Sequence, residues 1–100
     1  MVEPLTDEEI LKAIPKIVKK YLPDARVILY GSRARGDYKP YSDFDIAVDN
    51  KGRVVEPATI YLIREELDNL PTLKSFDVVD LNSVSEEFRK LILKEGIELE

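Results

Sequence analysis

The stretch LYGSRARGDYKPYSDFDIAV, residues 29–48, joins two apolar runs through a loop rich in glycine, arginine and aspartate. The run that leads into it, ARVILY (25–30), has almost no polar break, which is typical of a strand buried on both faces. The run that closes it, DFDIAVD (43–49), alternates as a second strand. The loop between them is either a phosphate and metal site or an ordinary polar connection.

A helix is predicted before the first strand. Thr6 and Glu9 have the spacing of a capping box, so the helix should begin at about Asp7. Apolar residues then recur at helical spacing as far as Tyr21, although Pro15 is expected to kink the helix or split it in two.

Helical and strand patterns alternate after the second strand. Apolar residues between Pro57 and Pro71 are spaced as a helix face, and SFDVVDL (75–81) is a third strand candidate. Ser83 with Glu86 suggests another capping box, and Gly96 a helix end. The last four residues, IELE, form either a short strand or a frayed end.

This order of elements predicts an α/β (α+β) fold in which helices pack on a small mixed β-sheet. A chain of 100 residues can bury one core, so residues 1–100 are expected to form a single domain.

Composition excludes several kinds of site. The chain has no cysteine and no histidine, which rules out disulfides, thiolate or imidazole zinc sites and histidine general bases. A net charge of -5 argues against general nucleic-acid binding, and no apolar run approaches the ~18 residues of a membrane span. The N-terminal segment is acidic, unlike a signal peptide, so a cytoplasmic location is expected.

The polar loop does not match the common phosphate motifs. Gly31 and Gly36 have the glycine spacing of a phosphate loop, but Asp37 and Tyr38 stand where the motif needs lysine and then serine or threonine. The dinucleotide fingerprint also fails. What remains is Gly31-Ser32 directly after a buried strand, where backbone amides can approach a phosphate closely. The alternative is a plain turn that ends the strand.

Aspartates on the second and third strands are candidate metal ligands. Asp43 and Asp45 would share one strand face with their Cα atoms roughly 7 Å apart, a separation that suits one or two Mg²⁺ ions. Asp77 could join them if the third strand lies beside the second. A solvated strand face is the alternative for the first two, and an ion pair with Arg26 or Arg89 for Asp77.

Three further charged residues have other candidate roles. Asp80 would point to the opposite face from Asp77, which predicts a strand-end or helix-cap residue. Arg33 and Arg35 could balance the charge of a bound phosphate, although loop arginines are also commonly solvated.

Together, Gly31-Ser32, Asp43 eleven positions after Ser32, Asp45 and a later Asp77 resemble the minimal nucleotidyltransferases of the DNA polymerase beta-like superfamily. The resemblance covers essentially the whole chain and implies their fold. It implies that Gly31 and Ser32 hold nucleotide phosphates and that Asp43, Asp45 and Asp77 bind Mg²⁺, with two ions expected.

The resemblance also implies a reaction: transfer of a nucleoside monophosphate, AMP from ATP, to a hydroxyl group. Among the family's branches the stand-alone domains fit a chain of this length. In these, the resemblance implies an antitoxin that binds a HEPN-domain toxin and modifies one of its tyrosines. Two alternatives remain: a non-catalytic binding antitoxin, and a small-molecule nucleotidyltransferase whose acceptor site is shared across a homodimer.

Overall fold

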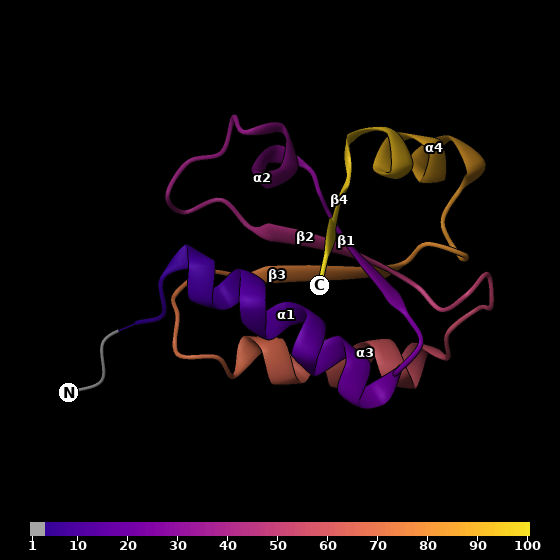
Figure 1. The fold of residues 1–100 in the computed structure, drawn as a ribbon, viewed down its shortest axis with the longest axis horizontal. Coiled ribbons are helices and arrows are strands. Elements are labelled where there is room, and N and C mark those ends of the chain that lie inside the picture. The colour runs from indigo at the N-terminus through magenta and orange to yellow at the C-terminus, as the bar shows by residue number, and fades with distance from the viewer. Residues whose placement is uncertain (1–3) are drawn as a thin grey trace.

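Helices and strands alternate along the 4–100 segment that the computed structural model describes (Figure 1). They are α1 (Asp7–Tyr21), β1 (Arg26–Tyr30), α2 (Ser32–Arg35), β2 (Phe44–Asp49), α3 (Pro57–Asp68), β3 (Phe76–Asp80), α4 (Glu86–Glu95) and β4 (Ile97–Leu99). The predicted order is confirmed, with two refinements. The polar loop contains the short helix α2, and the last residues form β4.

The four strands form one mixed sheet in the order β3-β2-β1-β4. β1 runs antiparallel to both β2 and β4, whereas β2 and β3 are parallel because α3 forms the crossover between them. The prediction of a small mixed sheet is therefore confirmed. The two apolar runs that flank the polar loop become the central strands.

The helices cover both faces of the sheet (Figure 1). On one face, α1 and α3 pack over alternate strand residues such as Phe44, Ile46 and Val48, which are fully buried. On the other face, α4 packs over Ile28 and Ala47. Because side chains alternate along a strand, Asp45 lies on this second face, between Phe44 and Ile46 of the first.

The helix boundaries test three sequence predictions. The Thr6 and Glu9 capping box is present and starts α1 at Asp7. Pro15 does not split α1, because one proline removes a single intrahelical hydrogen bond and the helix is held by its buried face. The prediction of a capping box at Ser83 and Glu86 was wrong. The Ser85 side chain instead accepts from Phe88 N–H and caps α4, and the Ser83 hydroxyl donates to Asp80.

No helix in the described part of the chain is both long and apolar enough to cross a membrane.

Candidate active site

The strand register brings two of the predicted site residues, Asp45 and Asp77, into one row with Tyr30. Tyr30 on β1 pairs with Asp45 on β2, and Asp45 pairs with Asp77 on β3. Residues paired in this way point to the same face, and adjacent strands lie about 4.8 Å apart. Gly31 follows Tyr30 immediately, so the Gly31-Ser32 turn and two carboxylates meet at one end of the sheet.

Gly31 lies directly against the Asp45 carboxylate. Its φ of 74° is in the left-handed region, and a Cβ at this position would collide with Asp45 Oδ2. Both the backbone conformation and the close approach therefore require glycine. Ser32 then begins α2, and Gly36 ends it in a second left-handed conformation.

The three aspartates form an electrostatic cluster. Burial raises the pKa of Asp45 above its ordinary value, and the nearby charges of Asp77 and Asp43 raise it further. Within the described chain, no donor forms a hydrogen bond to the Asp45 or Asp43 side chain. Repulsion among carboxylates without compensating donors is the situation that a bound cation relieves.

Asp43 lies outside the strand on which it was predicted. β2 begins at Phe44, so Asp43 lies one residue before the strand and is exposed. In residues 4–100, no three acidic side chains are arranged as a ready metal cluster. The donor set fits Mg²⁺ with few protein ligands, since this ion commonly takes one or two carboxylates and completes its shell with water and substrate phosphate.

Asp77 has a different partner from those expected. Arg64 on α3 lies with Nη2 3.5 Å from Asp77 Oδ1, and both side chains are about half exposed. Neither Arg26 nor Arg89 pairs with it: Arg26 contacts Asp49 and Glu98, and Arg89 donates to Asn82. An exposed pair at this distance is weak, so Asp77 stays available to a ligand.

The two predicted arginines lie in different environments. Arg35 is exposed and pairs with Asp37 at 3.4 Å and with Glu95 at 3.0 Å. Arg33 is buried, and its guanidinium donates to the Ser42 and Pro40 carbonyls and to Asp7.

The Arg33 guanidinium also lies over an aromatic ring, with its Cζ 4.0 Å from the centre of Phe44. Phe44 belongs to the face that α1 and α3 cover. The contacts of Arg33 are therefore with the loop and α1, on the face opposite to Asp45.

Besides Arg64, two residues at the site were missed from the sequence. Tyr30 is buried, and burial followed by the charges of Asp77, Asp45 and Glu95 raises the pKa of its hydroxyl. Glu95, at the end of α4, accepts a hydrogen bond from Gly31 N–H at 3.2 Å. Tyr30 could have been identified as a site residue from the sequence, because it directly precedes Gly31 at the end of the first strand. Glu95 is 64 positions away from Gly31, and its role depends on tertiary packing.

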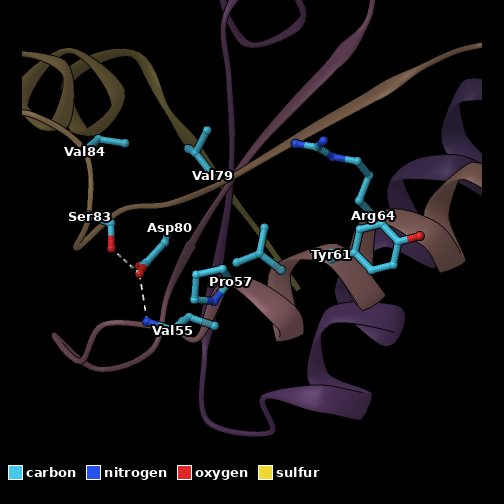
Figure 2. A pocket seen from close by; sticks show the side chains of 9 residues that line it. Val55, Pro57, Tyr61, Arg64, Val79, Asp80, Ser83 and Val84 are labelled. Atoms are coloured by element: carbon cyan, nitrogen blue, oxygen red, sulfur yellow. Dashed lines mark hydrogen bonds between the residues drawn. The ribbon is translucent and has the colours of Figure 1, made fainter.

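An apolar groove of about 410 Å³ lies between α3 and β3 (Figure 2). Tyr61 and Arg64 of α3 line one side, and Val79 of β3 lies opposite them. Arg64 connects the groove to Asp77 through their ion pair. The Asp80 carboxylate faces the groove, where it accepts hydrogen bonds from Val55 N–H and the Ser83 hydroxyl.

Comparison with known proteins assigns the family. The sequence model described as "Polymerase beta, Nucleotidyltransferase" matches residues 12–99. The chain is similar to the probable protein adenylyltransferase MntA of Haemophilus influenzae, with 33% identity over 92 residues, covering 86% of this chain and 75% of that protein.

Solved structures share the fold. A toxin-antitoxin crystal structure with AMP-PNP superposes with a TM-score of 0.74 at 24% identity, covering 90% of this chain and 72% of that one. The complex of a tri-AMPylated Shewanella oneidensis HEPN toxin with its MNT antitoxin gives 0.71 at 21% identity, covering 95% and 72%. The nucleotidyltransferase fold and the family expected from the sequence are confirmed: this chain belongs to the polymerase beta nucleotidyltransferase family.

Proposed function

We propose that this chain transfers AMP from ATP to a hydroxyl group of a HEPN-domain partner protein and acts as the antitoxin of that pair. The observation that carries the proposal is the pairing of Asp45 with Asp77 on neighbouring strands, with Gly31 lying directly against the Asp45 carboxylate. Two relatives support the choice of substrate, because one is described as a protein adenylyltransferase and another as bound to an AMPylated toxin.

Gly31, Ser32 and Arg35 would bind the phosphate chain. At Gly31 the backbone approaches Asp45 so closely that a side chain would not fit. Ser32 and Arg35 are the first and last residues of α2, which follows directly. Arg35 is exposed at the site, whereas the three donor nitrogens of Arg33 are already occupied. We therefore assign Arg35 to the nucleotide and Arg33 to the support of the loop.

We propose that two Mg²⁺ ions would be held by Asp45, Asp77 and Asp43. The bound metal supplies charge neutralisation for the phosphates and for the transition state. The raised pKa of Asp45 supports a cation here, because burial and the neighbouring carboxylates make its ionised form costly without one.

The acceptor would approach from the β3 side. In an in-line displacement the attacking oxygen and the leaving pyrophosphate lie on opposite sides of the phosphorus. The phosphate-binding residues follow β1, and β2 lies between β1 and β3. The acceptor hydroxyl would therefore meet Asp77, whose carboxylate can accept its proton, beside Arg64 of the groove.

We also propose that residues 1–100 form one domain, since the described helices all pack on a single sheet. Because ATP is the substrate, we place the protein in the cytoplasm, where ATP is abundant.

The proposal is tested by incubating the chain with α-labelled ATP, Mg²⁺ and its proposed HEPN-domain partner protein. We expect label on the partner, none with EDTA, and none with Asp45→Asn. Asp68→Asn, an exposed aspartate at the end of α3, is the matched control and should label normally.

Other outcomes separate the alternatives. Protection from the toxin that survives Asp45→Asn would show a binding antitoxin. Pyrophosphate release with hydroxylated small molecules, but no label on protein, would show a small-molecule enzyme.

A further inference from the structure

The carboxylate of Glu95 lies where an anion would bind. One of its oxygens accepts from Gly31 N–H at 3.2 Å, and the other lies 3.0 Å from Arg35 Nη1. The Glu95 side chain is only 12% exposed, whereas the Arg35 side chain is 48% exposed. A backbone N–H and a guanidinium that converge on one carboxylate form an occupied anion site.

These two donors are also groups that the proposed function gives to the nucleotide. A phosphate oxygen and a carboxylate oxygen cannot accept the same Gly31 hydrogen at once. The Arg35 Nη1 group could turn to a phosphate only by giving up its contact with Glu95.

Charge repulsion also opposes the presence of Glu95 and a phosphate at the same donors. Burial, Asp77 and Asp43 raise the pKa of Asp45 most, and the charge of Glu95 adds to them. Glu95 therefore lies close enough to act on the metal-binding carboxylates. A triphosphate entering beside it would add several negative charges to a region that already contains four carboxylates.

We propose that Glu95 is an internal competitor for the phosphate subsite: its carboxylate occupies the Gly31 and Arg35 donors until the distal phosphates of a nucleoside triphosphate displace it. This inference rests on the proposed nucleotide site. Nucleotides without distal phosphates bind without displacing Glu95. After transfer, return of the carboxylate to its two donors helps pyrophosphate to leave.

The position of Glu95 makes such an exchange local. It is the last residue of α4, and Gly96 and β4 follow at once. A change of side-chain rotamer at a helix end moves the carboxylate without disturbing the packing of Ile92, which is fully buried one turn earlier.

The variant Glu95→Gln tests the competition. It keeps the size of the side chain and one oxygen that can accept from Gly31, but removes the charge. With Mg²⁺ present, we expect the Kd for ATP and for pyrophosphate to fall about 5- to 10-fold, with the Kd for AMP unchanged. Calorimetric titration of each ligand measures this.

Glu87→Gln is the matched control, because Glu87 is exposed on the same helix and the variant loses the same charge. It should leave all three Kd values unchanged. If Glu95 only held Arg35 and the turn in place, Glu95→Gln would weaken ATP binding, and that result would overturn the inference. An equal gain for ATP and AMP, or no gain, would also overturn it.

The outcome is distinguishable from failure of the proposed function. Wild-type protein that binds ATP and transfers AMP, with Glu95→Gln binding ATP equally well, would contradict the role of Glu95 alone. Wild-type protein that does not bind ATP with Mg²⁺ would contradict the nucleotide site itself.

Discussion

The two ends of the β2 and β3 strand pair carry aspartates that differ in hydrogen bonding. We call the end with Asp45 and Asp77 the near end and the end with Asp49 and Asp80 the far end. At the far end, Asp49 accepts from Gly52 N–H and Asn82 Nδ2, both at 2.9 Å, and Asp80 accepts from three donors. At the near end, Asp45 has no such donor within the described chain and faces Asp77. Hydrogen-bond satisfaction, rather than residue type, distinguishes the structural carboxylates from the candidate catalytic ones.

The largest expected effect is on AMP transfer. Asp45→Asn should lower the transfer rate about 100-fold or more, because loss of a charged metal ligand removes transition-state stabilisation of that order. Asp80→Ala should leave the rate per folded molecule within about 2-fold, since its carboxylate acts at the other end of the strands. Initial rates with labelled ATP measure both. Similar losses in the two variants would remove the distinction between the ends.

The second effect is on stability and has the reverse pattern. Asp80→Ala should lower the free energy of unfolding by about 1–3 kcal/mol, because the N–H of buried Val55 loses its partner. Asp45→Asn should not destabilise the protein without ligands, since it relieves repulsion. Urea unfolding measures both. A larger loss for Asp45→Asn than for Asp80→Ala would contradict the comparison.

The distinction between the ends was only partly predictable from sequence. Strand alternation placed Asp43 and Asp45 on one face and Gly31-Ser32 directly after the first strand, whereas Asp77 could join them only if the third strand lay beside the second, as it does. Asp80 was correctly predicted at a strand end for the same reason.

What the sequence could not supply were long-range partners. Glu95 reaches Gly31 and Arg64 reaches Asp77 from helices whose positions depend on packing of the whole chain. Arg33 shows the same limit. It lies two residues from Arg35, yet its guanidinium packs over Phe44 while Arg35 is exposed.

A smaller effect concerns the pH dependence of stability, where the two ends should have opposite signs. Burial raises the pKa of Asp49, but hydrogen bonds from Asn82 and Gly52 with the charge of Arg26 outweigh it and lower that pKa. Asp49 therefore stabilises the fold above its unfolded pKa, and this contribution is lost as pH falls through the lower folded value.

Asp45 behaves in the opposite way because its folded pKa is raised. Its contribution is fully present below the unfolded pKa and is lost as pH rises through the folded pKa. The free energy of unfolding should be measured from pH 3 to 7. Compared with wild type, it should fall less towards neutral pH in Asp45→Asn and less towards acid pH in Asp49→Asn. Identical pH profiles for the two variants would count against these assignments.

The smallest effect is expected at the Arg64 and Asp77 ion pair. Arg64→Ala should change the free energy of unfolding by about 0.5 kcal/mol or less, because both side chains are about half exposed and the contact is 3.5 Å. Urea unfolding at low salt gives the value. A loss above about 1 kcal/mol would mean that Asp77 is held as firmly as Asp80 and is not free for a ligand.

The most direct test of the account is a calorimetric titration of ATP into the protein with and without Mg²⁺, repeated with Asp45→Asn. We predict binding that requires Mg²⁺ and is lost in Asp45→Asn, because the unsatisfied carboxylates at the near end of β2 and β3 hold the cation that the phosphates share. ATP binding of equal strength without Mg²⁺, or unchanged in Asp45→Asn, would contradict it.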